Sequence, residues 1–463
     1  MRGQVARATL PTLLDCHFYR AIMLPEHVPV SLYKHKHPFR TTILMNQSKI
    51  YRLDNRLIFE GEFRIGDILT PLDELHHAVA DEQRKEIIID FSGCEAAFAG
   101  PMLALCAQVM NFRLSGVSSR LIAPQNPDLL RLFNNANWAY FLDPEAAKPS
   151  KFRGFTQVPA TQFTNAKEQH TAVDKILDAI LGAVPTIGRK DLAAIEWSIN
   201  EITDNVLTHS QSKIGGLVQM STFVKSMKRV EYIVADAGLG IPATLRPTHP
   251  DITSDASALE QAIREGVTRD KNVGQGNGLF GSYRICSHSK GFFQLESGVG
   301  TLSFSDRGGL KVATERVPYE GTLVAAQIDF SVPHLLDEAL SFGGKAYSPA
   351  DYIEMKYEQH GTEDLIFKIA DEAHSVGSRV AGTPVRKRLL GLIRLCPGRK
   401  IILDFDRVPL VSSSFADEVV GKMFVELGAS TFLQFFQLSN LNPTVRKLID
   451  RAITQRSAVG LVN

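Results

Sequence analysis

Glutamate, asparagine and histidine side chains recur at helical spacing in one segment of the chain, and together they suit nucleotide chemistry. In DLAAIEWSINEITDNVLTHS, Glu201, Asn205 and His209 are four residues apart, so they share one face of a helix. An amide oxygen is a hard ligand for Mg²⁺, and a carboxylate can orient or deprotonate a nucleophile. A solvated stripe on an amphipathic helix has the same spacing, and for this segment taken alone it is the commoner case.

A second segment, VEYIVADAGLGIP, sends an apolar strand into a glycine-rich turn. Asp236 ends the strand, and Gly238 and Gly240 follow it. A buried carboxylate needs a hydrogen-bond donor, for which an adenine amino group is one candidate. Glycines let the backbone approach a flat ligand closely. A plain exit from strand to turn remains the alternative for this segment alone.

A third segment, TRDKNVGQGNGLFGSYRI, is a glycine-rich loop before a helix. The backbone amides around Gly274, Gly276 and Gly278 could cradle phosphates. Arg269 and Lys271 could also contact phosphate, although basic side chains in such loops are more often simply solvated. GNGLFG fits G-x-G-x-x-G, but a helix and a polar loop precede it instead of a strand, which disfavours a dinucleotide site. The chain contains no G-x-x-x-x-G-K-[ST], which excludes a P-loop.

The hydrophobic pattern predicts the elements that must position these side chains. Strands alternate with helices before and after the three segments, which predicts a mixed α/β fold. Linkers are expected near 143–154 and 341–351, where Gly, Pro, Ser and charged residues gather. The first segment is predicted to be a helix because its apolar residues recur at helical spacing. They are Ala194, Ile195, Ile199, Ile202, Val206 and Leu207.

Two stretches outside these segments have similar amino-acid sequences. KEIIIDF and RKIILDF end in Asp-Phe, with the aspartates at Asp90 and Asp404. NPDLLRLF follows the first stretch and NPTVRKLI follows the second, with asparagines 36 and 38 residues after those aspartates. Two matches in register predict a duplicated fold, present as two domains that flank a middle one.

Composition limits the classes of partner and compartment. At about 100–200 residues per domain, 463 residues suggest two to four domains. Lys plus Arg number 51 against 50 for Asp plus Glu, so no overall field attracts nucleic acid or acidic lipid. Five cysteines without a C-x-x-C pair favour a reducing compartment. Pro11, Asp15 and Arg20 interrupt the only N-terminal apolar stretch, which disfavours a signal peptide. We expect a cytoplasmic protein without nucleic-acid or membrane partners.

Four motifs in order give the middle of the chain a family resemblance. E-x-x-D-N contains Glu201 and Asn205, DAGLGIP and GQGNGLFG follow, and YEGTLVAAQI closes the series with Gly321 and Thr322. Over about residues 165–330 this text resembles the GHKL (gyrase, Hsp90, histidine kinase, MutL) ATPase superfamily. The resemblance implies a Bergerat-type ATP-binding domain, an α+β sandwich at 160–332, with ATP and Mg²⁺ as ligands.

The resemblance also implies a role for each matching residue. Asn205 would hold Mg²⁺, and Glu201 would act as a base or position water. Asp236 would read the adenine amino group, and Thr322 would support the adenine site. The remaining nucleotide-binding residues would be His209, Gly238, Gly240 and the lid residues Gly274, Gly276 and Gly278.

Within the superfamily, the text is most similar to bacterial anti-sigma-factor serine kinases. EITDNVLTHS resembles their box, including His209 four residues after Asn205, and the preceding helix resembles their first helix. Histidine kinases carry a long helical hairpin with a phosphorylated histidine. His170 lies on one short predicted helix, so we expect a plain surface histidine there.

The flanking regions resemble STAS domains, the fold of anti-sigma-factor antagonists. In 46–146, the loop that carries the phosphorylated serine in that family is Ala97–Gly100, which has no hydroxyl, so a docking or scaffold role is implied. In 346–463, the matching loop is Ser412–Phe415, with Ser413 at the acceptor position. It lacks the family's Asp and Gly, and a serine cap of a helix is the more expected role.

The fold class expected overall is α/β, with a GHKL domain between two STAS-like domains and an irregular extension at 1–45. The leading hypothesis is a cytoplasmic, ATP-dependent serine kinase in signalling. Its partners would be STAS-type or sigma-factor-type regulatory proteins, or Ser413 of another copy. The alternative is a slow ATPase that acts as a switch or scaffold and controls docking of the flanking domains. Homo-oligomerisation is left open.

Overall fold

The structure is a computed structural model with a mixed α/β fold, as the sequence predicts. No helix in the part of the chain that it describes is long and apolar enough to cross a membrane. The expected extension at 1–45 lies outside that part. The described residues are 48–150, 157–184, 187–223, 228–267, 277–330, 339–342, 344–347, 349, 351–358 and 363–460.

An N-terminal unit contains a four-stranded sheet with the order β1-β2-β3-β4. β1 and β2 form an antiparallel hairpin, and Asp54 at its turn has a φ of 56°. β3 is parallel to both β2 and β4. The strands are β1 (Lys49–Leu53), β2 (Arg56–Phe63), β3 (Glu86–Ala97) and β4 (Ser118–Ile122). The helical elements are η3 (Ile65–Asp67), α1 (Leu69–His76), η4 (His77–Asp81), α2 (Ala99–Leu114), α3 (Pro127–Asn135) and α4 (Trp138–Leu142).

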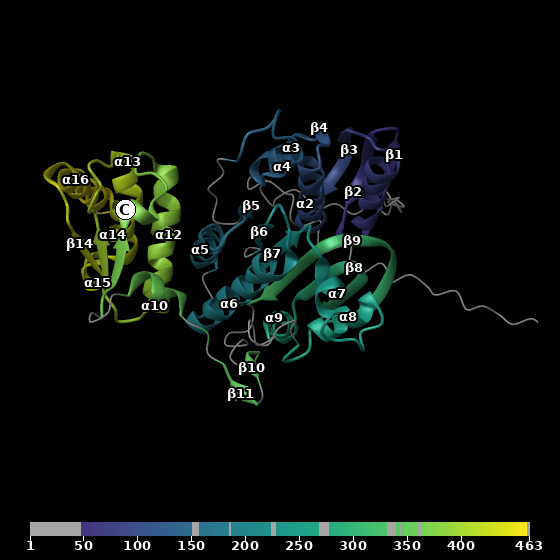
Figure 1. Ribbon diagram of the computed structural model, residues 1–463. Helices are drawn as coiled ribbons and strands as arrows, with labels where there is room; N and C mark the ends of the chain where they lie inside the picture. The colour runs from purple at the N-terminus through teal and green to yellow at the C-terminus, as the bar shows by residue number, and fades with distance from the viewer. Residues whose placement is uncertain are drawn as a thin grey trace, which may run out of the picture.

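A middle unit contains a five-stranded antiparallel sheet with the order β5-β6-β7-β9-β8. Figure 1 shows the N-terminal unit above this sheet and α6, α7, α8 and α9 below it. The strands are β5 (Gln157–Phe163), β6 (Gly216–Thr222), β7 (Arg229–Asp236), β8 (Phe292–Ser305) and β9 (Gly309–Asp329). The helical elements are α5 (Ala166–Ala183), α6 (Arg189–Asn205), η5 (Val206–Ser210), α7 (Gly240–Leu245), α8 (Asp255–Ala262) and α9 (Gly278–His288).

Both faces of the five-stranded sheet are buried. Along β7, Tyr232 and Val234 belong to the core on the helix-covered side of the sheet. Ile233 and Ala235 belong to the core that the sheet shares with the N-terminal unit. This alternation follows the two-residue period of a strand. A sheet covered on both faces makes the middle and N-terminal units one continuous packed body.

The helix α2 lies between the two sheets. Twelve of its 16 residues are buried, because the helix contacts β4 and α4 of its own unit and β6, β7 and β9 of the middle unit. Polar bonds cross the same boundary. Gln108 Nε2 donates to the carbonyl oxygen of Glu320 at 2.5 Å, and Trp138 Nε1 donates to Gln219 Oε1 at 2.8 Å. The N-terminal unit is therefore a fixed layer against the middle unit.

A C-terminal unit, residues 351–460, has a three-stranded parallel sheet with the order β12-β13-β14. A short hairpin, β10 (Ser341–Phe342) and β11 (Lys345–Ala346), precedes it. The strands are β12 (Leu365–Lys368), β13 (Ile401–Asp404) and β14 (Phe436–Ser439). The helical elements are α10 (Tyr352–Tyr357), α11 (Ile369–Glu372), α12 (Arg379–Leu395), α13 (Ser413–Ala416), η6 (Asp417–Gly421), α14 (Lys422–Leu427), α15 (Ala429–Phe435) and α16 (Pro443–Gly460).

The two repeated stretches of sequence take equivalent places in their sheets. KEIIIDF lies in β3 and RKIILDF in β13, and each of these strands has a parallel neighbour on both sides. Asn126 Oδ1 accepts a hydrogen bond from the amide of Asp128 at 2.9 Å. Asn442 Oδ1 accepts one from the amide of Val445, also at 2.9 Å. Each asparagine caps a helix that begins at the next residue, a proline, so the repeated text folds into repeated local structure.

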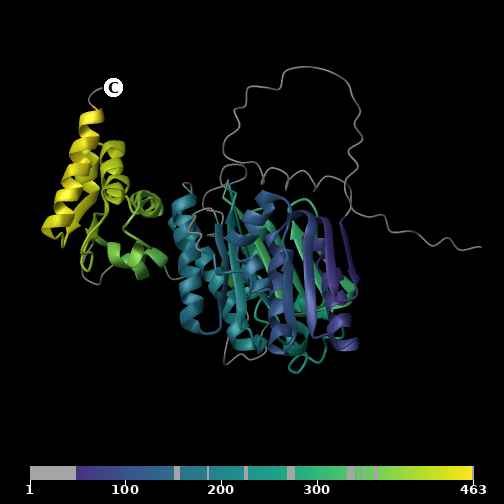
Figure 2. The same cartoon turned by 90° about the horizontal axis from the view of Figure 1, so that it is seen from above.

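The C-terminal unit packs on α5 through buried charges and close helix contact, beside α5 in both views (Figures 1 and 2). Arg388 of α12 donates to Asp178 of α5 and to Glu372, both at 2.6 Å. The Arg388 side chain is 7% exposed. At Gly391, a Cβ atom would lie 2.7 Å from the carbonyl oxygen of Leu181. The absence of a side chain there lets α12 approach α5.

Candidate functional site

A cavity of about 390 Å³ lies on the helix-covered side of the five-stranded sheet. Small-ligand pockets usually have volumes of about 300–1,000 Å³. The cavity brings together α6, η5, the end of β7, α7, the start of α9 and β9. Seven residues that the sequence nominates for nucleotide binding line it, namely Glu201, Asn205, His209, Asp236, Gly240, Gly278 and Thr322.

The last turn of α6 supplies the acid and amide side chains of the cavity. Glu201 is half-buried, and the start of α9 lies against it, since a Cβ atom on Gly278 would be 2.6 Å from Glu201 Oε2. Burial raises the pKa of Glu201, and the nearby carboxylate of Asp204 raises it further. A carboxyl with a raised pKa is a better proton acceptor at neutral pH than an ordinary glutamate.

The donor atoms beside Glu201 suit one kind of metal site. No group of three or more His, Cys, Asp or Glu side chains in the described ranges could hold a metal ion by itself. Mg²⁺ usually keeps several waters and takes one or two protein ligands together with substrate phosphates. The amide oxygen of Asn205, which lines the cavity, would be one such protein ligand, and the phosphates of a nucleotide would supply others.

Asp236 brings a buried carboxyl to the cavity. It is 1% exposed, and its Oδ1 accepts a hydrogen bond from the amide of Gly238 at 2.8 Å. Burial raises the pKa of Asp236 to about 7, although the amides of Gly238 and Thr322 donate to it and favour the charged form. A buried carboxylate in this position favours a ligand that presents a hydrogen-bond donor.

Two residues that sequence reasoning missed hold the strand end that carries Asp236. Tyr319, which is buried, donates its hydroxyl to the carbonyl oxygen of Asp236 at 3.1 Å. Ser297 Oγ accepts from the amide of Ile241 at 2.9 Å and donates to the carbonyl oxygen of Gly321 at 2.6 Å. Ser297 lies outside the four motifs, and Tyr319 is the first residue of YEGTLVAAQI, where only Gly321 and Thr322 are nominated.

The glycines after Asp236 have structural reasons that differ from the expected one. Gly238 does not line the cavity, and a Cβ atom there would lie 2.1 Å from the carbonyl oxygen of Ser210. That carbonyl accepts a hydrogen bond from the amide of Leu239 at 2.7 Å. Gly240 does line the cavity and has a φ of 77°, which favours glycine. Gly238 therefore serves the packing of the turn on η5 and not the approach of a ligand.

The other nominated residues lie in three different situations. His209 reaches the cavity from η5, a π-helical turn that continues α6. The lid residues Arg269, Lys271, Gly274 and Gly276 lie outside the described residues. Ser413 is the first residue of α13 in the C-terminal unit and does not line the cavity; Figure 1 shows α13 on the far side of α12 from α6. His170 is exposed on α5, as expected of a surface histidine.

Aromatic residues complete one wall of the cavity, and two of them come from a stretch that the sequence suggests is a linker. Trp197 lies one turn before Glu201 on α6, and Phe342 and Tyr347 belong to the β10–β11 hairpin. The expectation of a plain linker at 341–351 is corrected by this hairpin. Strands of two residues have no periodicity that sequence reasoning could detect.

The serine loop of the C-terminal unit begins the helix that runs through α13, η6 and α14. Ser412 caps this helix, since its Oγ accepts a hydrogen bond from the amide of Phe415 at 3.0 Å. Its hydroxyl also lies 3.1 Å from that of Ser414. Ser413 is exposed. The expected helix cap is therefore supplied by Ser412, which leaves the hydroxyl of Ser413 accessible.

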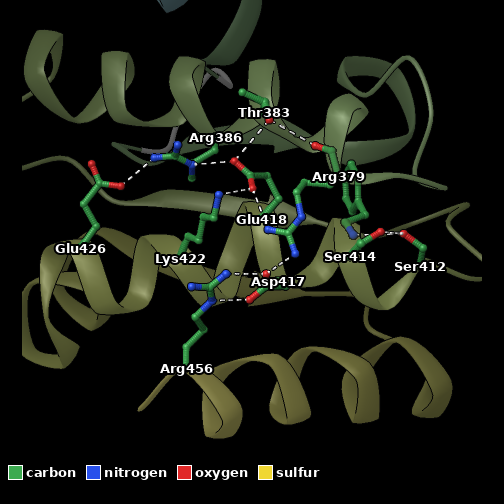
Figure 3. Close-up of polar contacts among 11 residues, drawn as sticks. Arg379, Thr383, Arg386, Ser412, Ser414, Asp417, Glu418, Lys422, Glu426 and Arg456 are labelled. Atoms are coloured by element: carbon green, nitrogen blue, oxygen red, sulfur yellow. Dashed lines mark hydrogen bonds and ion pairs between the residues drawn. The ribbon is translucent and has the colours of Figure 1, made fainter. Parts of the chain in front are cut away.

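A charge cluster fixes the same helix one turn later (Figure 3). Arg456 donates to the two oxygens of Asp417 at 2.6 and 2.8 Å, and Arg379 reaches this carboxylate at 2.7 Å. These bonds, that of Arg456 above all, lower the pKa of Asp417 to about 2. Glu418 is buried and pairs with Lys422 at 2.6 Å. The cluster joins α12, η6 and α16 and so holds the serine loop in a fixed frame.

Comparison with known proteins gives one family match. Residues 381–446 match the model of a family described as a STAS-like domain of unknown function (DUF4325). The match runs from α12 into α16 and includes the serine loop and the acidic residues Asp417 and Glu418 of the charge cluster, but no residue of the cavity. No curated protein matches the chain. The C-terminal region thus contains a STAS-like domain, as its resemblance implies.

Proposed function

We propose that this protein binds Mg-ATP in the cavity in the manner of GHKL ATPases, and uses it to phosphorylate or otherwise regulate STAS-type partners. One observation carries the proposal. Glu201 and Asn205 from a helix, Asp236 from a strand end and Thr322 from a distant strand line one cavity. Each is the residue type that its expected role needs.

The buried carboxyl of Asp236 supports recognition of adenine. Asp236 is 1% exposed at the cavity wall, so water cannot readily hydrogen-bond to its carboxyl. An adenine amino group would donate to the carboxylate, and Val234, Leu245 and Val324 supply apolar walls for a flat base. Guanine has a carbonyl at the equivalent place and would face the carboxylate as a second acceptor.

The Glu201 side of the cavity supports phosphoryl transfer. A hydroxyl of water or of a partner serine would attack the γ-phosphorus while Glu201 accepts its proton. The bond between the γ-phosphorus and the bridging oxygen would break, and ADP would leave. Mg²⁺ held through Asn205 would neutralise charge on the phosphate oxygens. The exposed Ser413 loop of another copy and the serines of separate STAS-type proteins are the acceptors proposed.

Calorimetry with Mg-ATP, followed by turnover measurements, tests this function. We expect wild-type protein to bind Mg-ATP and Asp236→Asn to lose most of that affinity. Glu201→Gln should bind with unchanged affinity and fail to turn the nucleotide over, because it keeps the shape but not the base. Wild-type protein that does not bind Mg-ATP, or Asp236→Asn protein that binds it equally well, would refute the proposal.

A second candidate is an ATP-driven switch without a protein substrate. It is favoured by Arg189, the first residue of α6, which pairs with Asp351 and, at 2.7 Å, with Glu358 of the C-terminal unit. The same helix carries Glu201 and Asn205, so a change at the nucleotide could reach the docking contacts. Nucleotide-dependent partner binding without any phosphoprotein would support the switch, whereas acid-stable phosphoserine would support the kinase. Acid-labile label on His170 would indicate a histidine kinase instead.

A further inference from the structure

Three aromatic rings meet where the β10–β11 hairpin reaches the cavity. The ring centroid of Trp197 lies 5.9 Å from that of Phe342 and 6.0 Å from that of Tyr347. The centroids of Phe342 and Tyr347 are 5.7 Å apart. Rings at these separations are in contact, so the three side chains form one aromatic wall, in which Tyr347 is the most exposed ring, at 45%. All three line the cavity.

The hairpin is held against the helices of the middle unit. Arg284 of α9 donates to the carbonyl oxygen of Ser341 at 3.1 Å. Leu340 is 1% exposed, and a Cβ atom on Gly281 would lie 2.4 Å from the Trp197 ring and 3.2 Å from Leu340. Since α9, α6 and the hairpin interlock around these residues, the wall is part of the fold of the cavity.

The wall stands at the Glu201 side of the cavity. Trp197 and Glu201 are four residues apart on α6 and thus neighbours on one helix face. The rings of Phe342 and Tyr347 carry no charge to pair with a phosphate. An apolar wall beside a carboxyl excludes water, and exclusion of water disfavours the charged form of the carboxyl.

We propose that Phe342 and Tyr347 are positioning residues that, with Trp197, close the Glu201 side of the cavity and keep bulk water from its carboxylate. The inference rests on the proposed function, in which Glu201 accepts a proton. It assigns part of the reaction site to the segment between the middle and C-terminal units.

Three other titratable groups line the cavity with Glu201 and also affect how the hydrolysis rate depends on pH. Asp204 stands beside it on α6, His209 comes from η5 and Asp236 from β7. The cavity-lining residues of α9, Gly278 and Leu279, are uncharged. On the hairpin, Lys345 is exposed. None of these groups changes when Phe342 or Tyr347 is replaced, so a difference between variants reports the wall.

Quenching of tryptophan emission by acrylamide tests the wall without any turnover. The chain has two tryptophans, and Trp138 is 1% exposed, so the quencher reports on Trp197. We expect stronger quenching in Phe342→Ala and Tyr347→Ala than in wild type. Tyr51→Ala is the matched control, since its ring is 36% exposed on the N-terminal unit, and its quenching should equal that of wild type.

The pH dependence of Mg-ATP hydrolysis tests the positioning role. The base is the carboxylate, so the rate rises with pH through the pKa of Glu201. Removing either ring admits water to the carboxyl, which lowers its pKa. The acid side of the pH–rate profile should therefore shift to lower pH by up to about one unit in Phe342→Ala and Tyr347→Ala. In Tyr51→Ala the acid side of the profile should stay in place.

The outcomes separate this inference from the proposed function. If the wild-type protein hydrolyses Mg-ATP and the acid side of the pH–rate profile does not shift in either Phe342→Ala or Tyr347→Ala, the inference is overturned and the proposed function stands. This holds whether or not quenching rises. Unchanged quenching overturns it as well, because the rings then shield nothing. Wild-type protein that does not bind Mg-ATP refutes the proposed function and removes the inference with it.

Discussion

Removing the charge of Asp236 should make the nucleotide-free protein more stable at high pH. The pKa of Asp236 is raised by burial from an ordinary value of 3.8 to about 7, against hydrogen bonds from the amides of Gly238 and Thr322. A carboxyl with a higher pKa in the folded state binds its proton more tightly there. Ionising it therefore costs folding free energy, and this cost grows as the pH rises from about 4 to about 7.

The magnitude follows from the same values. About three pKa units correspond to roughly 4 kcal/mol above pH 7. Asparagine has the shape of aspartate without its charge, but its NH₂ group would face a backbone amide, which costs about 1–3 kcal/mol. We therefore expect Asp236→Asn to raise the free energy of unfolding by about 1–3 kcal/mol at pH 8. Near pH 5 the cost of ionising the wild-type carboxyl falls to about 1.6 kcal/mol, so the advantage of the variant should largely disappear there.

Urea denaturation of nucleotide-free protein at several pH values between 5 and 8 measures this difference. Three other carboxyls, those of Glu196, Glu231 and Glu296, also have pKa values raised to about 7, chiefly by desolvation. They titrate equally in both proteins, so the difference between variant and wild type isolates Asp236. A difference that stays constant, or that shrinks as the pH rises, would show that the Asp236 carboxyl is not held in a water-poor site.

Three further changes test separate parts of the molecule. GTP should bind at least about 10-fold more weakly than ATP in calorimetry, because it offers Asp236 no donor; equal affinities would contradict that contact. Gly278→Ala places a Cβ atom 2.6 Å from Glu201 Oε2, so hydrolysis should fall about 10-fold or more at unchanged affinity. Gly66→Ala, which meets nothing within 4 Å, is its control. Arg388→Leu leaves Asp178 and Glu372 with Lys356 as their remaining cationic partner, and urea denaturation should show a loss of about 1–3 kcal/mol; an unchanged midpoint would mean that Arg388 does not stabilise the docking.

Local periodicity accounts for the part of the site that the sequence predicts. The apolar spacing around Glu201 and Asn205 identifies a helix, and the run before Asp236 identifies a strand that ends at that residue. A helix packed on a sheet brings the end of one near the end of the other. Because both elements are specified by short-range pattern, their side chains could be nominated before the fold was known.

Tertiary contacts determine the rest of the site, and they leave little trace in local text. Phe342 and Tyr347 stand in a stretch rich in Gly and Ser, where nothing indicates that the chain turns back to a cavity. Tyr319 acts through one hydroxyl on a strand neighbour. At Gly238, the carbonyl oxygen of Ser210 leaves no room for a side chain, and the local sequence gives no sign of this contact.

The sequence of α2 predicts that this helix is buried, but not which elements bury it. GPMLALCAQVM is apolar on every side, which is typical of a helix buried all round. The pattern does not say that the second partner is a sheet of the middle unit. The contacts of Gln108 and Trp138 hold the N-terminal unit against that sheet, and the docking or scaffold role that the resemblance to STAS domains implies stays a prediction.

The position of α2 between two sheets also bears on how the chain is synthesised. The strands that cover its second side are β6, β7 and β9, and β9 ends at Asp329. At about 5–20 residues per second, the ribosome takes roughly 10–40 s to pass from the end of α2 to that strand. During this interval the N-terminal unit presents an uncovered apolar helix. The nascent chain is therefore most open to aggregation and to chaperone capture after α2 has emerged and before β9 has.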